Sequence, residues 1–291
     1  MTFLPLLILL RMPEPAAAQP LMTGQDLLAL PQPPAHHTIA YGKAPQQVAE
    51  LRLPEGPGPH PVVILVHGGC WQAPWGFDHL RSLAAALTAE GHATWSLEYR
   101  RLGDPGGGWP GTFEDVAGGA DHLREAAKAH PLDLGRVVAV GHSAGGHLAL
   151  WLAGRHRLPA GSALRTAAPL PLRGVVALAG IGDLRAGAEG RVCGDAIPQL
   201  LGGPPDAAAD RVRQASPIEL LPLGVPQRLI CGAHDAIVPI EHARAYEAAA
   251  RSAGDAVFVR VVEGAGHFEL VDPGSVAFPA VRDAVTALLP R

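Results

Sequence analysis

The chain has 291 residues, of which 48% are hydrophobic and 17% are charged, and its formal net charge is −4. A chain of this length and composition can bury a sheet and its covering helices as a single domain. Acidic and basic residues are mixed without runs of one sign, which argues against a nucleic-acid partner. The 14 histidines show no metal-ligand spacing such as H-E-x-x-H, so we expect neither a metal nor another cofactor.

The N-terminus carries a short apolar run, TFLPLLILL, followed by AAAQP, which offers an A-x-A cleavage pattern after Ala18. The run is too short to cross a bilayer, so no stable membrane span is expected. Residues 1–20 are interpreted as a leader or a signal peptide. Against a signal peptide, no basic residue precedes the run, and Arg11 follows it. Cleavage predicts a periplasmic or secreted protein, and an uncleaved leader predicts a cytoplasmic one.

Strand and helix patterns alternate through residues 21–291, which we expect to form one domain. Residues 36–42 and 47–54 alternate around a short turn, as in an antiparallel hairpin. Buried strands are then predicted at 61–69, 92–99, 136–140, 174–180, 227–233 and 256–264, and helices at 77–91, 112–130, 144–153, 240–253 and 278–289. Thr112 is the predicted N-cap of the second of these helices.

This alternation predicts an α/β fold in which a mostly parallel sheet is covered by helices on both faces. The segment 182–222 is different, because it is rich in Gly, Pro and Ala and has little strand signal. It is interpreted as a short cap-like insertion over the carboxyl edge of the sheet, where ligands bind in open α/β folds. The sequence leaves the conformation of this insertion and the oligomeric state open.

The three cysteines, Cys70, Cys193 and Cys231, show no C-x-x-C spacing. Their odd number predicts no disulfide framework. Cys70 follows a pair of glycines. We expect it to contribute to the site through its backbone amide more than through its thiol as an alternative nucleophile.

The clearest motif is GHSAG, residues 141–145, which lies between a predicted strand and a predicted helix. In the G-x-S-x-G motif the serine lies on a strained turn with its hydroxyl exposed, and the glycines relieve crowding. Ser143 is therefore the predicted nucleophile. The alternative is a chance match in a glycine-containing loop.

A serine nucleophile needs a general base and a group that orients the base. In this fold the three residues follow in the chain order Ser, acid, His. Asp235 in LICGAHDAIVP and His267 in VVEGAGHFELVDP each follow a predicted buried strand, and both are assigned to the catalytic triad. Asp183 also follows a strand, but one strand too early, and is predicted to cap the insertion instead.

Acyl transfer also requires hydrogen-bond donors for the oxyanion. The loop VHGGCWQ follows the first long buried strand, and the amides of Gly69 and Cys70 are its predicted donors. The amide of Ala144, the residue after the nucleophile, is the third. Trp71 and His142 are assigned to the substrate pocket.

From about residue 36 to the C-terminus, these motifs resemble the α/β-hydrolase superfamily. HGGCW, GHSAGGH and GHFELVDP resemble the branch that contains kynurenine formamidases (arylformamidases) and related bacterial esterases, and YGKAPQQVAELRLP and SPIELLP fit the same branch. The resemblance implies a metal-independent serine hydrolase with its triad at Ser143, Asp235 and His267. It also implies an oxyanion hole formed by Gly69, Cys70 and Ala144.

The expected activity is cleavage of small carboxylic esters or aryl formamides through an acyl-enzyme. Export from the cytoplasm would favour a general esterase over a formamidase. One alternative is a peptidase similar to prolyl oligopeptidases, which usually carry a large propeller domain that this chain has no room for. Another is a non-catalytic binding protein with a hydrolase fold, although such proteins typically lack a triad member. The sequence does not determine the physiological substrate or the acyl-chain length.

Overall fold

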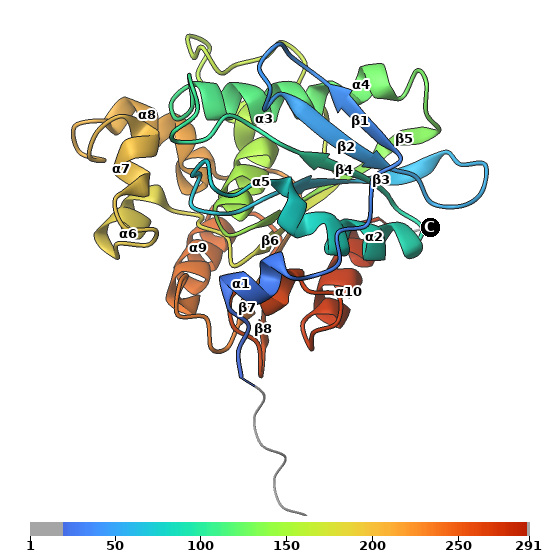
Figure 1. The fold of residues 1–291 in the computed structure, drawn as a ribbon. Helices are drawn as coiled ribbons and strands as arrows, with labels where there is room; N and C mark the ends of the chain where they lie inside the picture. Colours follow the sequence, from blue (N-terminus) through green and yellow to red (C-terminus); the bar gives the residue numbers. More distant parts are fainter. Residues whose placement is uncertain (1–19, 290–291) are drawn as a thin grey trace, which may run out of the picture.

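The computed structural model describes residues 20–289. The cleavage pattern after Ala18 and nearly all of the predicted leader, residues 1–20, therefore lie outside the described residues. An eight-stranded sheet forms the centre of the molecule (Figure 1), in the order β1-β2-β4-β3-β5-β6-β7-β8. The strands are β1 (His37–Ala40), β2 (Val48–Arg52), β3 (His60–Val66), β4 (Ala93–Leu97), β5 (Leu132–His142), β6 (Gly174–Leu178), β7 (Gln227–Gly232) and β8 (Val257–Val262).

The sheet combines antiparallel and parallel pairing. β1 and β2 form the predicted antiparallel hairpin, and β2 also pairs with β4 in antiparallel orientation. The strands from β3 to β8 are mutually parallel. The central strands β3, β4 and β6 are almost entirely buried, as expected for strands covered on both faces. The predicted fold class is confirmed.

Helices cover both faces of this sheet (Figure 1). α2 and α10 pack on one face, and α3, α5 and α9 pack on the other. The α-helices are α1 (Gly24–Leu28), α2 (Arg81–Ala89), α3 (Gly111–Asp121), α4 (Leu123–Ala126), α5 (Ala144–Gly154), α6 (Leu184–Glu189), α7 (Ala196–Leu201), α8 (Ala209–Ala215), α9 (Ile240–Ser252) and α10 (Phe278–Leu288). Short 3-10 segments are η1 (Phe77–Leu80), η2 (Arg155–Arg157), η3 (Pro217–Leu220) and η4 (Glu269–Val271).

The helix predicted over residues 112–130 differs from the structure in two respects. It is divided into α3 and α4, and Thr112 is not its N-cap, because α3 begins one residue earlier, at Gly111. The Thr112 hydroxyl instead donates a hydrogen bond to the carbonyl of Arg100 at 2.5 Å. The hydroxyl thus bonds to the chain after β4 and does not cap the helix.

The segment 182–222 follows β6 and consists of the short helices α6, α7 and α8 with η3. As predicted, the Asp183 side chain caps α6 by accepting hydrogen bonds from the amides of Arg185 and Ala186. Several apolar side chains anchor the segment, and Ile197 and Leu200 are completely buried.

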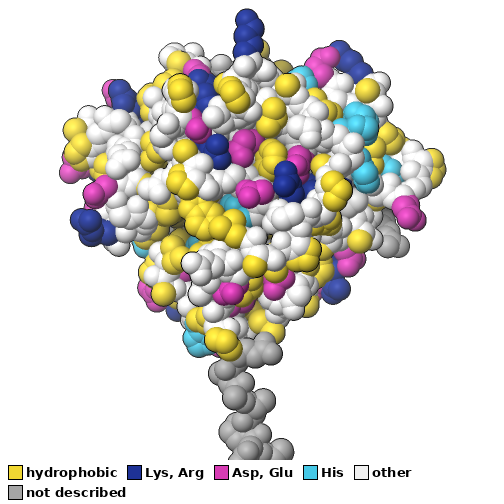
Figure 2. All heavy atoms as spheres, in the orientation of Figure 1, with side chains coloured by type: hydrophobic (Ala, Val, Ile, Leu, Met, Phe, Trp, Pro, Cys, Tyr) yellow, Lys and Arg dark blue, Asp and Glu magenta, His cyan; other side chains and the backbone are white. Residues whose placement is uncertain are grey.

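On the face of the molecule shown in Figure 2, acidic and basic side chains are interspersed.

The expectation that the cysteines form no disulfide was wrong, because Cys70 and Cys193 are disulfide-bonded. The two residues are separated by 123 positions, but the loop after β3 and the segment after β6 meet in space, and their Cα atoms lie 5.5 Å apart. An odd number of cysteines only required one to stay unpaired, and that residue is the buried Cys231.

Among the described residues, no helix is both long and apolar enough to cross a membrane.

Candidate active site

Ser143 occupies the sharp turn between β5 and α5. Its backbone is at φ 55° and ψ −120°, a conformation that costs a non-glycine residue about 1–3 kcal/mol. A Cβ at Gly141 would overlap the carbonyl of Gly145, and a Cβ at Gly145 would overlap the carbonyl of Val66. The two glycines of the motif are therefore required by the close approach of β3, β5 and α5. The turn places Ser143 at the N-terminus of α5, where the helix dipole favours negative charge.

His267 and Asp235 form a hydrogen-bonded pair on the loops after β8 and β7. His267 Nδ1 lies 2.7 Å from Asp235 Oδ2, and both side chains are almost fully buried. The other carboxylate oxygen, Oδ1, accepts the amides of Ile237 and Val238 at 2.8 and 2.9 Å. The turn thus holds the carboxylate, the carboxylate holds the proton on Nδ1, and His267 Nε2 is left as a proton acceptor.

Ser143 and His267 line the same pocket, which has a volume of about 140 Å³. Within residues 20–289, no hydrogen bond joins the Ser143 hydroxyl to His267. Such contacts are often long in a free enzyme and tighten when substrate binds. The structure therefore brings all three predicted triad residues to one site, with the acid–histidine contact already formed.

The three predicted oxyanion donors lie beside Ser143. Gly69 and Cys70 line its pocket, and Ala144 is the first residue of α5. Among the described residues, the amides of Gly69, Cys70 and Ala144 are bonded to no acceptor. Because unpaired amides near a nucleophile can bind a developing oxyanion, the geometry suits the assigned role.

The loop that carries two of these donors has an unusual backbone. Gly69, Cys70 and Trp71 all have positive φ, at 95°, 53° and 56°. A positive φ is disfavoured for a residue with a side chain by roughly 1–2 kcal/mol. The amide of Gln72 donates to the carbonyl of Gly69 at 2.9 Å and closes a turn over these residues, and contacts from elsewhere in the molecule also stabilise the loop.

One of these contacts, which the sequence analysis missed, involves His67 and Glu98. His67 Nε2 lies 2.8 Å from Glu98 Oε1, and His67 Nδ1 lies 2.8 Å from the carbonyl of Gly68. Burial acts to raise the pKa of Glu98, but His67 and Arg101 more than compensate, and the pKa lies below its ordinary value. The ionised carboxylate thus connects the start of the oxyanion loop to the end of β4.

The two residues assigned to the pocket lie in different places. His142 does line it, and its Nε2 lies 3.0 Å from the carbonyl of His267. Burial lowers the pKa of His142 well below its usual value, so a neutral ring lies next to the base. Trp71 does not line the pocket, which corrects that assignment. Its side chain is fully buried and packs edge-on against His147, because the positive φ at Trp71 turns it into the core.

Several other pocket residues were not assigned from the sequence. The apolar wall contains Leu27 of α1, Trp75, Ile237 and Phe268, and Gln72 and His79 are also in the lining. Phe268 and Ile237 lie next to predicted triad residues, and this proximity was an available signal. No sequence signal pointed to Leu27, because its position depends on how α1 packs against the rest of the molecule.

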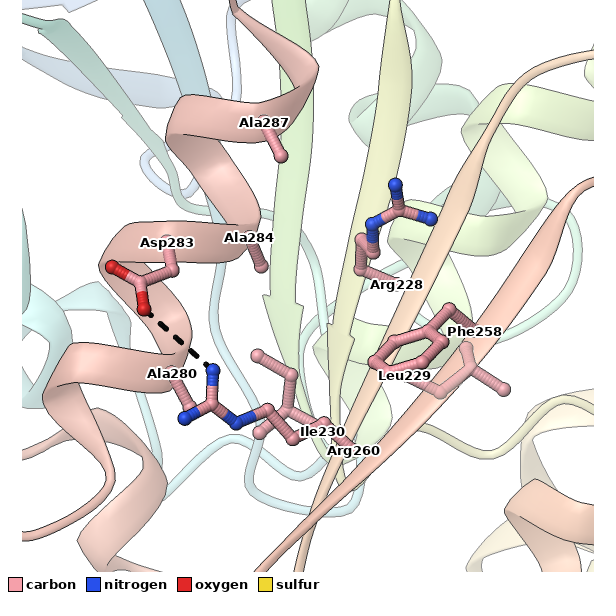
Figure 3. Close-up of a pocket in the computed structure, with 9 residues that line it drawn as sticks. All are labelled: Arg228, Leu229, Ile230, Phe258, Arg260, Ala280, Asp283, Ala284 and Ala287. Carbon is pink, nitrogen blue, oxygen red and sulfur yellow. Dashed lines mark ion pairs between the residues drawn. The ribbon is translucent and has the colours of Figure 1, made fainter.

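A second hollow, of about 160 Å³, lies between α10 and the strands β7 and β8 (Figure 3). Arg228, Arg260, Asp283 and the exposed ring of Phe258 contribute to its lining. Arg260 Nη1 lies 3.6 Å from Asp283 Oδ2. Its described lining contains no Ser, Thr, Cys or His side chain, so it offers neither a hydroxyl or thiol nucleophile nor a histidine base.

Comparison with known sequences gives two informative matches. The BD-FAE family matches the chain over residues 50–249, which includes the oxyanion loop, Ser143 and Asp235. Esterase LipC of Mycobacterium tuberculosis is 30% identical over 254 residues, covering 80% of this chain. The match covers 60% of the length of that mycobacterial esterase.

Solved structures share the fold at low sequence identity. A truncated carbohydrate esterase from gut microbiota superposes with a TM-score of 0.74 at 22% identity, covering 87% of this chain and 95% of that one. Esterase B from Lactobacillus rhamnosis, inhibited by a tributyrin phosphonate, gives 0.73 at 19% identity, with 90% of each chain covered. Esterase 2 of Thermogutta terrifontis, phosphonylated by sarin, gives 0.71 at 19% identity, covering 90% of this chain and 96% of that one.

Proposed function

The chain belongs to the BD-FAE family of α/β-hydrolase-like esterases, and on this premise we propose that it is a serine hydrolase that cleaves small carboxylic esters through an acyl-enzyme. The observation that carries the proposal is the placement of Ser143 and the His267–Asp235 pair at one pocket. Esterase LipC, which matches most of this chain, supports the same activity.

In the first half of the proposed reaction, Ser143 Oγ attacks the ester carbonyl carbon while His267 Nε2 takes the serine proton. Asp235 stabilises the imidazolium that forms, because its carboxylate is already bonded to Nδ1. The carbonyl oxygen becomes an oxyanion, and the unpaired amides of Cys70 and Ala144 donate to it. The C–O bond of the ester then breaks, and His267 returns the proton to the departing alcohol.

In the second half, water replaces the alcohol and the same groups act in reverse. His267 Nε2 accepts a proton from the water, whose oxygen attacks the acyl carbon. The second oxyanion is held by the same amides, and its collapse releases the carboxylic acid and returns the proton to Ser143. The neutral, buried His142 adds no positive charge that would disfavour the imidazolium.

The size and lining of the pocket support small substrates. Its volume of about 140 Å³ lies below the roughly 300–1,000 Å³ typical of sites for drug-sized ligands. Leu27, Trp75 and Phe268 offer apolar surface to an acyl group. We therefore expect short acyl chains to be cleaved fastest.

The test is a side-by-side assay of purified protein on p-nitrophenyl acetate, butyrate and octanoate and on N-formylkynurenine. The expected result is the highest kcat/KM on the short esters and its loss in Ser143→Ala. Turnover by Ser143→Ala near the wild-type rate would contradict the mechanism. A kcat/KM for N-formylkynurenine far above that for the esters would identify an arylformamidase instead, and no turnover of any substrate by the folded protein would favour a binding protein.

A further inference from the structure

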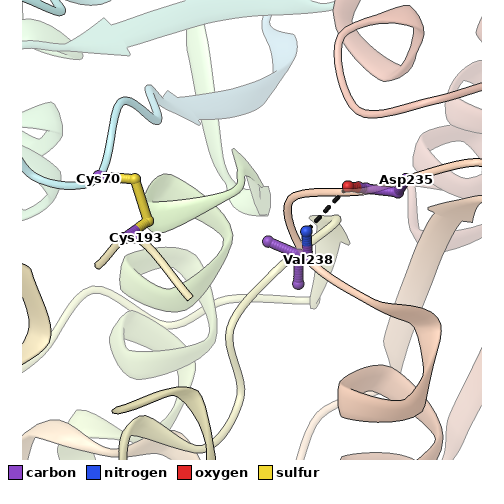
Figure 4. The surroundings of a disulfide bond; sticks show 4 residues. All are labelled: Cys70, Cys193, Asp235 and Val238. Carbon is purple, nitrogen blue, oxygen red and sulfur yellow. Dashed lines mark hydrogen bonds between the residues drawn. A yellow bond between two sulfur atoms is a disulfide. The ribbon is translucent and has the colours of Figure 1, made fainter. Parts of the chain in front are cut away.

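The Cys70–Cys193 disulfide joins two parts of the active-site edge that are distant in sequence. Cys70 carries one of the predicted oxyanion amides, and Cys193 lies between α6 and α7 in the segment 182–222. Figure 4 shows the two sulfurs bonded between the loop after β3 and this segment. The bond therefore attaches a donor-bearing residue directly to the cap-like segment.

Apart from the disulfide, Cys70 is restrained through the backbone of its neighbours. Its amide has no acceptor among residues 20–289. The backbone around it is held by the amide of Gln72, which donates to the carbonyl of Gly69 at 2.9 Å and closes a turn over Cys70, and by the Trp71 carbonyl, which accepts the amide of Leu102 at 2.7 Å. Both bonds are made by neighbouring residues, whereas the disulfide attaches the positive-φ residue Cys70 itself to another part of the molecule.

The Cys193 end of the bond is well anchored. The side chain of its neighbour Val192 is 4% exposed, and the amide of Val192 donates to the carbonyl of Gly187 at 2.9 Å. The carbonyl of Cys193 accepts the amide of Ala196, and Ile197 is fully buried. The segment is therefore a firm support against which Cys70 can be held.

We propose that the Cys70–Cys193 disulfide positions the Cys70 amide in the oxyanion hole, so that reducing the bond lowers kcat. This inference rests on the proposed esterase function. Cys70 and Cys193 are both partly exposed, so a small dithiol can reach the bond. The dithiol gives up two electrons and forms its own disulfide, while the Cys70–Cys193 bond breaks and each sulfur becomes a thiol.

The effect of reduction is specific to the transition state. Negative charge develops on the carbonyl oxygen only as Ser143 attacks. Displacing a donor therefore raises the free energy of the transition state much more than that of the bound ester. Complete loss of one oxyanion donor lowers kcat by roughly 10²–10³-fold. A donor that is loosened and not removed is expected to lower kcat by about 10- to 100-fold, with little change in KM.

The bond also links activity to the redox state of the surroundings. Disulfides persist in oxidising compartments and are reduced in the cytoplasm. If the leader is cleaved after Ala18 and the protein is exported, the enzyme lies where the bond is formed and the oxyanion hole is complete.

The experiment compares oxidised wild type, wild type reduced with dithiothreitol and desalted without oxygen, and Cys193→Ser before and after the same treatment. Cys193→Ser removes the bond without changing residue 70, so the Cys70 amide is still present but is no longer tethered. Each sample is assayed for kcat and KM on p-nitrophenyl acetate, and for inhibition by a short alkyl trifluoromethyl ketone. The adduct of this ketone with Ser143 carries an oxyanion, so its affinity reports the oxyanion hole directly.

Reduced wild type and Cys193→Ser are expected to lose kcat by about 10- to 100-fold and to bind the ketone correspondingly more weakly, with KM within about twofold. Cys193→Ser should not respond to dithiothreitol. Unchanged kcat and ketone affinity in reduced wild type would overturn the inference. A rise in KM with loss of near-ultraviolet circular dichroism would also overturn it, because the bond would then support only the fold.

The same measurements separate the two proposals. An active wild type that does not respond to reduction overturns the positioning role alone. A folded, oxidised wild type with no esterase activity overturns the proposed function, and this inference fails with it.

Discussion

The turn that carries Ser143 and the loop that carries Cys70 contain residues with side chains at almost the same positive φ, 55° and 53°. They are stabilised in different ways. The Ser143 turn is enclosed by buried backbone, because Gly141 and Gly145 allow β3, β5 and α5 to approach closely. The Cys70 loop has one closing hydrogen bond of its own, from Gln72 to Gly69, and is otherwise held by Leu102, Glu98 and Cys193, which lie far along the chain.

This difference indicates which parts of the site keep their backbone geometry when a contact is lost. A turn that is enclosed by the backbone of neighbouring strands and a helix retains its shape as long as its glycines and these elements remain. A loop that is held by remote contacts changes when any one of those contacts is lost. We therefore expect the nucleophile geometry to be robust and the oxyanion geometry to be adjustable.

The largest expected effect comes from the triad. Asp235→Asn retains an oxygen that can accept the amides of Ile237 and Val238, but its amide group cannot accept the Nδ1 proton of His267. We expect kcat to fall on the order of 10⁴-fold with an unchanged fold, as measured by steady-state kinetics and circular dichroism. A decrease of less than tenfold would mean that Asp235 does not orient the base.

The next effect tests the steric requirement for glycine beside the Ser143 turn. In Gly145→Ala the new methyl group meets the carbonyls of Val66 and His67, which are backbone atoms and cannot rotate away. We expect the free energy of unfolding to drop by about 1–3 kcal/mol or more, as measured by urea denaturation, together with loss of activity.

Gly118→Ala is the matched control for this substitution. Gly118 lies inside α3, and no atom outside its own helix turn lies within 4 Å of the point that an alanine Cβ would occupy. The change to alanine should raise the free energy of unfolding by about 0.5–1 kcal/mol. Similar stability changes at the two glycines would refute the steric explanation of the turn.

The smallest effect concerns His147, which belongs to α5 and packs against Trp71 of the oxyanion loop. Burial lowers its pKa to about 4, below the roughly 6.5 of an unfolded chain. The unfolded state therefore binds a proton between these values and the folded state does not. The stability that neutral His147 contributes is complete above pH 6.5 and is lost as the pH falls toward 4.

Urea denaturation at pH 7.5 and pH 5.5 measures this dependence. In His147→Gln the loss of stability on acidification should be smaller by about 1 kcal/mol. An identical pH dependence in His147→Gln and the wild type would contradict the assignment of a neutral buried ring.

Much of the site was accessible from the sequence for a physical reason. In a parallel sheet the carboxyl ends of the strands lie at one edge, so residues that directly follow strands come together whatever the details of packing. Ser143 follows β5, Asp235 follows β7 and His267 follows β8, and the structure places all three at the same edge. The hydrophobic runs that predicted those strands thereby also predicted this proximity.

The sequence by itself therefore determined the order of strands and helices, the glycine-enclosed turn at Ser143 and the edge at which the candidate site forms. Only the tertiary structure decided that Cys70 pairs with Cys193, that Trp71 is buried in the core, and that Leu27 of α1 lines the pocket. These features depend on contacts between segments far apart in the chain. Local patterns of hydrophobicity and turn residues identify the residues at the ends of strands, but they do not specify how the loops and terminal segments pack against one another, because that choice is made by the packing of the whole molecule.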